Sequence, residues 1–211
     1  TGETIEIDSN DDLIAAIKNQ KDNQVWSIAP GTYDIGDACT GVQANMGNVE
    51  SGFVFPIFAD NLTIQGTGTG NVTITSSYDP NSGNWQVQNF ITISGENVTI
   101  QDVDLQANKN SFYDTCNKVI ELVDDAKNFK MKNVDLLPLS DENGRQFSGS
   151  IFFNVTNAGN SVLEDVTMYS WISASKVTDG TVTASNIVQD FTNNSYAGYS
   201  DLSYGYAWNP G

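Results

Sequence analysis

Four aspartates, Asp102, Asp104, Asp135 and Asp165, recur at matching places in a repeated sequence pattern and are the residues best suited to chemistry. If the copies of the pattern stack as strands in register, Asp104 and Asp135 lie about 4.8 Å apart on one outer face, and Asp102 and Asp165 line a second column. Stacked carboxylates repel one another unless they are protonated or bridged by a cation. Ca²⁺ takes about six to eight oxygen ligands of this kind. The four aspartates therefore predict a calcium site, and Ca²⁺ is the only cofactor that the sequence suggests.

The repeated pattern must position these side chains. Asn97 opens its cleanest copy, Asn-Val-Thr-Ile-Gln-Asp-Val-Asp-Leu, and related copies open at Asn128 and Asn160, 31 and 32 residues further along. Asparagine tolerates the left-handed backbone conformation and can hydrogen-bond the backbone around it. We therefore expect Asn97, Asn128 and Asn160 to stack as a ladder in which each side-chain amide bonds the next.

Within a copy, the apolar residues change phase. Val98 and Ile100 alternate with period 2, the polar pair at 101–102 interrupts the alternation, and Val103 and Leu105 resume it. A single flat strand does not change phase in this way, whereas a chain that turns a corner does. Each copy is therefore read as two short strands joined by a bend.

Another short apolar strand precedes each copy. These strands are Phe90–Ile93, Val119–Leu122, Ile151–Phe153 and Trp171–Ile172. Three strands for every 20 to 32 residues predict an all-β fold, a right-handed parallel β-helix that forms a three-sided solenoid. One turn of such a coil cannot bury its inner face alone, so the turns must stack.

The length of 211 residues suits a single domain, which we expect to span 1–211. A short amphipathic helix is predicted at about 9–20, where Ser9 is a suitable N-cap and Leu13, Ile14 and Ile17 share one face. This helix would cover the N-terminal end of the coils, which run from about 24 to 190. A tyrosine-rich segment, 191–211, follows.

The tyrosine-rich segment suggests a binding role, because aromatic faces stack on sugar rings and anchor protein interfaces. The alternative is that these side chains fold back over the last turn as a cap. If that turn is uncovered, its strand edges would pair with another copy of the chain. The predicted partners are therefore a polysaccharide or glycan, or copies of the chain itself. The candidate ligand or interface residues are Tyr196, Tyr199, Tyr204, Tyr206 and Trp208.

Charge and composition exclude some partners. Twenty-six acidic residues against nine basic ones give a net charge of −17, which repels nucleic acid and anionic lipid. No apolar run reaches the length of about 18 residues that a membrane-spanning helix requires, so membrane insertion is not expected. The excess of acidic residues has two explanations: they bind cations, or they only keep the chain soluble.

The start of the chain and the cysteines bear on its compartment. The sequence begins at Thr1 without an initiator methionine or an apolar leader, as a processed secretory product or a trimmed chain would. We expect a secreted or cell-surface location. In an oxidising compartment Cys39 and Cys116 would form one disulfide, worth about 4 kcal/mol in the chain-entropy model; otherwise they are two free thiols.

Three segments together resemble the pectate-lyase-like β-helix superfamily: Asp11–Ile17, Ile28–Tyr33 and the copy Asn97–Val103. The first two are similar to the N-terminal cap and first strand of that superfamily, and the third is similar to its standard coil. The resemblance implies the β-helix fold. It implies little about activity, because the same scaffold carries lyases, hydrolases, esterases, tailspikes and adhesins.

The catalytic motifs of the superfamily are not matched. Where its lyases carry an aspartate in a Val-Trp-Ile-Asp-His turn, the three clean copies have Gln101, Lys132 and Glu164. Histidine is absent and Arg145 is the only arginine, so the arginine-rich catalytic segment is missing. If the chain is a lyase, Lys132 is the candidate base beside Ca²⁺. Its alternative role is to neutralise Glu164 and the aspartates.

The sequence thus leaves open whether the chain is an enzyme and favours a non-catalytic one. The first hypothesis is an extracellular or cell-surface β-solenoid module with an adhesive or structural role, either self-assembling or glycan-binding. The second is a Ca²⁺-dependent polysaccharide lyase or another carbohydrate-active enzyme. The third is an N-terminal fragment of a longer β-helix protein.

Overall fold

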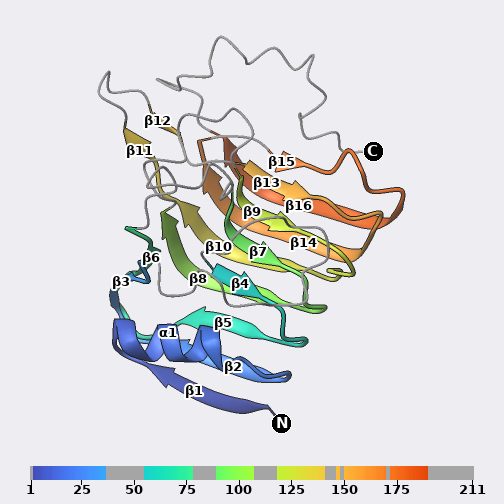
Figure 1. The fold of residues 1–211 in the computed structure, drawn as a ribbon. Helices are drawn as coiled ribbons and strands as arrows, with labels where there is room; N and C mark the ends of the chain where they lie inside the picture. Colours follow the sequence, from blue (N-terminus) through green and yellow to red (C-terminus); the bar gives the residue numbers. More distant parts are fainter. Residues whose placement is uncertain are drawn as a thin grey trace, which may run out of the picture.

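A computed structural model describes residues 2–36, 55–77, 89–106, 118–140, 146–147, 150–169 and 172–189. These residues form an all-β structure of mostly parallel strands in two sheets, with one short helix (Figure 1). The prediction of an all-β chain of parallel strands with one short helix is therefore confirmed. The arrangement agrees with a β-solenoid.

The larger sheet has the strand order β1-β2-β5-β8-β10-β14-β16, and every pairing along it is parallel. Two short strands, β3 and β6, extend it beside the second half of β8. Its strands are β1 (Glu3–Ile7), β2 (Gln24–Ile28), β3 (Gly31–Asp34), β5 (Thr63–Gly66), β6 (Val72–Thr75), β8 (Thr99–Gln106), β10 (Lys130–Leu136), β14 (Asn157–Met168) and β16 (Asp179–Gln189).

The smaller sheet has the order β15-β13-β9-β7-β4 and is also parallel. From β4 onward, each of its strands comes directly before a strand of the larger sheet along the chain. The links that return from the larger sheet to the smaller one include residues outside the described ranges. Its strands are β4 (Phe55–Ile57), β7 (Asn89–Ile93), β9 (Lys118–Leu122), β13 (Ser150–Phe153) and β15 (Ile172–Ser173). Apart from both sheets, β11 (Leu139–Ser140) and β12 (Gln146–Phe147) form a small antiparallel pair.

The larger sheet bends in the middle of its long strands. In β8, β10, β14 and β16 the bend falls at Asp102, Asn133, Asp165 and Asn186, whose φ angles are between 52° and 57°. Aspartate and asparagine enter this left-handed region more easily than other non-glycine residues. The phase change predicted at 101–102 therefore corresponds to a single left-handed residue at a corner.

One turn earlier the same corner is made by a longer connection between β5 and β6. β5 ends at Gly66, which stacks directly beneath Asp102, and a Cβ atom on Gly66 would overlap the Asp102 carbonyl oxygen. Glycine is required here because of this close backbone approach.

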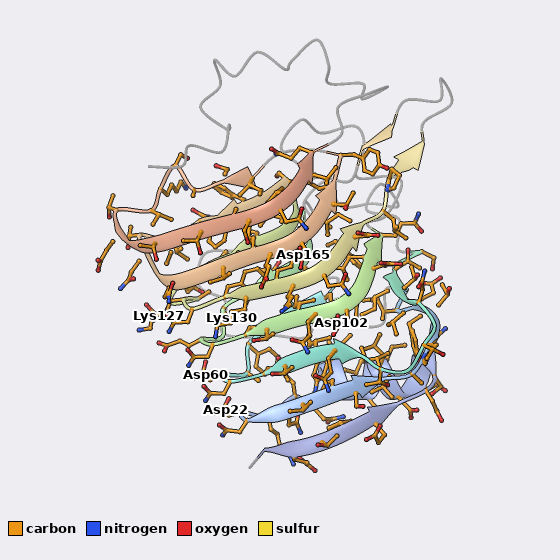
Figure 2. All side chains as sticks on the ribbon, turned by 180° about the vertical axis from the view of Figure 1, so that it is seen from behind. Asp22, Asp60, Asp102, Lys127, Lys130 and Asp165 are labelled. Atoms are coloured by element: carbon orange, nitrogen blue, oxygen red, sulfur yellow. The ribbon has the colours of Figure 1, made fainter. Side chains whose placement is uncertain are left out.

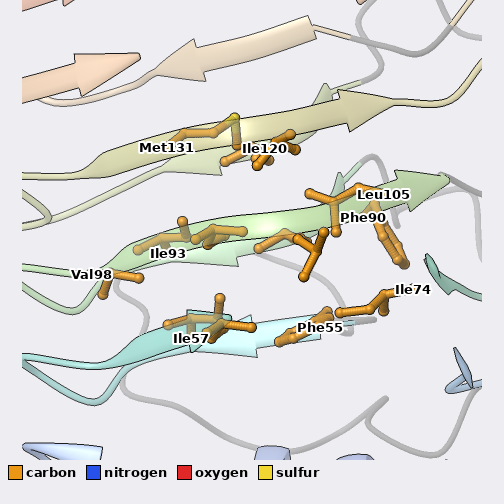
Figure 3. Packing of buried hydrophobic residues seen from close by; sticks show 14 of the residues in the cluster. Phe55, Ile57, Ile74, Phe90, Ile93, Val98, Leu105, Ile120 and Met131 are labelled. Carbon is orange, nitrogen blue, oxygen red and sulfur yellow. The ribbon is translucent and has the colours of Figure 1, made fainter. Parts of the chain in front are cut away.

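The core lies between the two sheets and is made by the inward-facing residues of their strands. Val98, Ile100, Val103 and Leu105 of one copy are all at most 2% exposed. Figure 3 shows how residues from neighbouring turns interlock, among them Phe55 and Phe90, whose rings meet edge to face with centroids 6.4 Å apart. This burial is the main contribution that holds the turns together.

Helix α1 (Asn10–Lys18) lies at the N-terminal end and packs against β1, β3 and β4. The Ser9 hydroxyl accepts a hydrogen bond from the Asp12 backbone N–H at 3.1 Å, as an N-cap does. Leu13 and Ile17 are fully buried, and Ile14 packs against the core from a half-buried position. Among the described residues, no helix is long and apolar enough to cross a membrane.

Candidate functional site

An asparagine ladder, made by Asn23, Asn61, Asn97 and Asn128, runs along the corner where the chain enters the larger sheet. All four residues have left-handed φ angles, between 55° and 64°. The side-chain amide of Asn61 donates to Asn23 Oδ1 at 3.1 Å, and those of Asn97 and Asn128 donate to the preceding member at 2.9 Å. The ladder therefore joins four successive turns through side chains, and the backbone N–H of each member also donates to a carbonyl of the next turn.

Asn160 does not continue the ladder with its side chain. At this turn the left-handed residue is Gly159, and a Cβ atom there would overlap Asn128 Oδ1. Asn160 contributes only its backbone N–H, which donates to Asn128 Oδ1 at 2.9 Å. Its own Oδ1 accepts from the Thr181 hydroxyl at 3.4 Å. The pairing of β14 with β16 shifts register between Asn157 and Asn160, and this irregularity moves the corner by one residue.

A second row of acidic residues lies beside the asparagine ladder and was not among the sequence predictions. Asp22 accepts from the Asp60 backbone N–H at 2.9 Å, and Asp60 accepts from the Glu96 N–H at 2.8 Å. Glu96 forms an ion pair with Lys127 at 3.1 Å. Figure 2 shows Asp22, Asp60 and Lys127 along one edge of the larger sheet. The signal for this row is the charged residue that directly precedes each ladder asparagine.

The corner residues of the larger sheet form a third row, the Asx row, made by Asp102, Asn133, Asp165 and Asn186. Asn133 donates to Asp102 Oδ1 at 2.8 Å, and Asn186 makes a short hydrogen bond to Asp165 Oδ1. Asp102 and Asp165 are labelled in Figure 2. Each of these two aspartates is thus held by an asparagine of the next turn.

Asp104 and Asp135 occupy directly opposed positions of β8 and β10. They continue an outward row that has Thr73 on one side and Thr167 on the other. Burial raises the pKa of Asp104 above its ordinary value, and the negative charge of Asp135 raises it further. The structure therefore brings together two of the four predicted calcium ligands and places them in a different row from the other two.

No group of three or more acidic, histidine or cysteine side chains lies close enough to hold a metal ion within the described ranges. Two opposed carboxylates supply too few ligands for Ca²⁺, which takes about six to eight oxygens. The calcium site stays a prediction, and the described side chains do not by themselves complete it.

Replacing Asp104 by asparagine is expected to raise the free energy of unfolding at neutral pH. A raised pKa means that the folded state disfavours the charged form, so the destabilisation is fully present above that pKa and vanishes below the ordinary value of 3.8. Like charges directly opposite on neighbouring strands are destabilising, and cross-strand side-chain pairs are worth roughly 0.2–1 kcal/mol. Urea denaturation of Asp104→Asn at pH 7 in EDTA should show a gain of about this size, and the gain should disappear near pH 3.

Asp135→Asn is the matched control, because it removes the like-charge repulsion and leaves Asp104 buried. It should give a smaller gain than Asp104→Asn. A loss of stability in both variants that appears only when Ca²⁺ is present would instead show that a cation bridges the pair.

Lys132, the candidate base, faces outward from β10 in a polar row with Gln65, Gln101 and Glu164. Its ammonium lies 3.7 Å from Glu164 Oε2, and both side chains are substantially exposed, at 56% and 44%. Gln101 donates to Gln65 Oε1 at 3.2 Å. The side chains of this row therefore pair with one another from strand to strand, Gln101 with Gln65 and Lys132 with Glu164.

The outer face of the smaller sheet carries a polar cluster that sequence reasoning missed. Glu121 is only 6% exposed, and its Oε1 accepts from the Asn154 amide at 2.9 Å. Lys176 donates to Asn154 Oδ1 at 2.7 Å and lies 5.5 Å from the centre of the Phe152 ring. The asparagine thus links a carboxylate and an ammonium, and gives each of them a hydrogen-bond partner. No periodic signal marks this cluster, because Glu121, Asn154 and Lys176 are different residue types.

The remaining predicted residues lie outside the described residues. These are Tyr196, Tyr199, Tyr204, Tyr206 and Trp208, together with Cys39 and Cys116. A comparison with models of known protein families finds no match, and neither does a comparison with curated protein sequences.

Proposed function

We propose that the chain is a right-handed parallel β-helix with three faces, of the pectate-lyase-like kind, and that it serves as a non-catalytic scaffold module of a secreted or cell-surface protein. Three features support the β-helix: the chain alternates between two parallel sheets, the larger sheet bends at the Asx row, and the asparagine ladder joins successive turns. The two halves of the larger sheet and the smaller sheet would be the three faces.

The observation that carries the scaffold role is that side chains suited to chemistry bond one another along the stack. Asp102 and Asp165 each accept from an asparagine, and Lys132 pairs with Glu164. A catalytic site needs side chains from several elements to converge on one reacting atom. Polar rows that repeat from turn to turn instead fix the register of the turns, which a rigid structural or adhesive module requires.

The alternative, a Ca²⁺-dependent lyase, is supported by the opposed pair Asp104 and Asp135 and by the presence of Lys132 on the neighbouring half of the sheet. It predicts two measurable effects that the scaffold does not. A lyase releases unsaturated sugars that absorb ultraviolet light. A filled calcium site also stabilises the folded state by about 2.7 kcal/mol when free Ca²⁺ is at about 100 times its Kd.

We expect the purified chain to give no rise in ultraviolet absorbance on uronic-acid polymers with millimolar Ca²⁺, and no Ca²⁺-dependent shift in its unfolding midpoint. A calcium-dependent pectate lyase in the same assay is the positive control. The scaffold proposal fails if absorbance rises and Lys132→Ala abolishes the rise while Lys130→Ala, a change to a neighbouring exposed lysine of the same strand, does not.

A further inference from the structure

The strand β16 forms one end of the larger sheet. It pairs with β14 on one side, and no described strand pairs with its other side. Its inward residues Val182, Ala184 and Ile187 are only partly buried, whereas Leu163 and Val166 one turn below are at most 1% exposed. The last described turn therefore presents a backbone edge to which no described strand is paired, and apolar side chains that are not fully covered.

This edge differs in charge from the rest of the molecule. The chain carries a net charge of −17, yet the ten residues between Asp179, the first residue of β16, and Asp190 contain no charged side chain. Val188 is 51% exposed and is the exposed large hydrophobic residue of the described part of the chain. Two copies of so acidic a chain would repel one another over most surfaces. β16 is a place where they can approach without opposing like charges directly.

The opposite end of the sheet is protected. β1 carries the exposed acidic residues Glu3 and Glu6, and α1 packs against its inner side. Charged side chains and a covering helix are two devices by which natural sheets prevent edge pairing. Of the two ends of the larger sheet, as far as its described strands show, the β16 end is therefore the one open to strand pairing. A contact between two identical ends closes into a two-fold dimer and cannot grow into a fibre.

We propose that β16 docks against β16 of a second copy, with the two strands antiparallel across a two-fold axis. Antiparallel pairing satisfies the free N–H and C=O groups of both edges. It also covers the partly buried Val182 and Ala184 of each copy with those of the other. The inference rests on the proposed scaffold role, for which it names the partner: two rods joined end to end, with both N-terminal caps facing outward.

The test is sedimentation velocity of the full chain over a range of concentrations. We expect a monomer–dimer equilibrium that strengthens with added salt, because salt screens the repulsion between the acidic bodies. Val188→Lys should raise the dimer Kd at least about tenfold, since lysine on an edge strand opposes pairing. Thr32→Lys is the matched control. Thr32 is exposed at the other end of the same outward row, and the substitution adds the same charge. It should leave the Kd unchanged.

Amide hydrogen exchange of 181–188 separates the possible occupants of the edge. Exchange that slows as the dimer forms supports the proposal. A chain that stays monomeric overturns it: slow exchange at every concentration would show that the chain covers its own edge, and fast exchange would show that the edge stays open. Equal Kd values for Val188→Lys and Thr32→Lys would also overturn it. A monomer without lyase activity would overturn the dimer and leave the scaffold role standing. A dimer with lyase activity would overturn the scaffold role and leave the dimer standing.

Discussion

Replacing Phe129 by alanine is expected to lower the free energy of unfolding by about 3–5 kcal/mol, the usual cost of emptying a buried phenylalanine site. The Phe129 side chain is 1% exposed. Its ring meets Phe153 of the next turn edge to face, with the ring centres 6.4 Å apart. Its backbone N–H donates to the Ser161 hydroxyl, and its carbonyl accepts from Val162. The hydrogen bonds to Ser161 and Val162 hold the backbone around the Phe129 side chain in place. The cavity that alanine would leave therefore cannot easily close.

Urea denaturation followed by circular dichroism measures this loss. Phe129→Leu is the control, because it keeps most of the volume and should cost less than about 1.5 kcal/mol. An alanine variant that loses less than the leucine variant would show that Phe129 is not packed between the turns.

Replacing Asn97 by alanine is expected to cost about 2–5 kcal/mol. Alanine at φ 57° pays roughly 1–2 kcal/mol for the left-handed conformation. The substitution also removes two ladder hydrogen bonds, the one that Asn97 donates to Asn61 and the one that it accepts from Asn128. Each is worth about 0.5–1.5 kcal/mol. Because the ladder bonds join three turns, the loss should appear as a lower midpoint of the whole unfolding transition.

Asn97→Gly separates the two contributions. Glycine adopts the left-handed conformation without a steric cost, and the chain itself has Gly159 at this corner two turns later. The glycine variant should therefore lose roughly half as much as the alanine variant. Equal losses in the two variants would mean that the backbone conformation contributes little and that the side-chain bonds dominate.

The parts of the fold that repeat were predictable from the sequence. A change of phase between Ile100 and Val103 predicts a corner, because period 2 cannot otherwise be broken without turning an apolar side chain outward. The left-handed Asp102 lies at that corner. The helix was predictable for a different reason: Ser9 and the face of Leu13 and Ile17 are local signals that do not depend on the rest of the chain.

Small irregularities in the repeat were not predictable. Asn160 stands at the expected spacing from Asn128, yet Gly159 takes the left-handed position, because the strand pairing shifts there. Asn23 was missed as a ladder member although it precedes an alternating segment, Gln24–Ile28. In its turn the two halves of the pattern form separate strands, β2 and β3, instead of one continuous strand. Sequence similarity to the other copies is therefore weak.

The candidate site was harder to predict than the fold, because outward-facing residues are constrained only by their neighbours on adjacent turns. The sequence placed four aspartates in two columns, and the register of β8 and β10 indeed opposes Asp104 and Asp135. Which partner each carboxylate takes depends on hydrogen bonds between turns about 31 residues apart. The asparagine that holds Asp102 was visible in the sequence, but its role as a donor was not.

The alternation between the two sheets has a consequence for how the length of this chain can vary. The returning link from β3 to β4 is long, and the one from β14 to β15 is short, yet strand pairing in both sheets stays parallel. The asparagine ladder and the Asx row, by contrast, turn their corners at single residues whose neighbours are bonded from turn to turn. From β8 onward, insertions and deletions are therefore tolerated mainly at the returning corner, since the other two corners vary by no more than the one-residue shift between Asn157 and Asn160. In evolutionary terms, segments can be exchanged in the links that return from the larger sheet to the smaller one, and these exchanges would leave the register of the strands undisturbed.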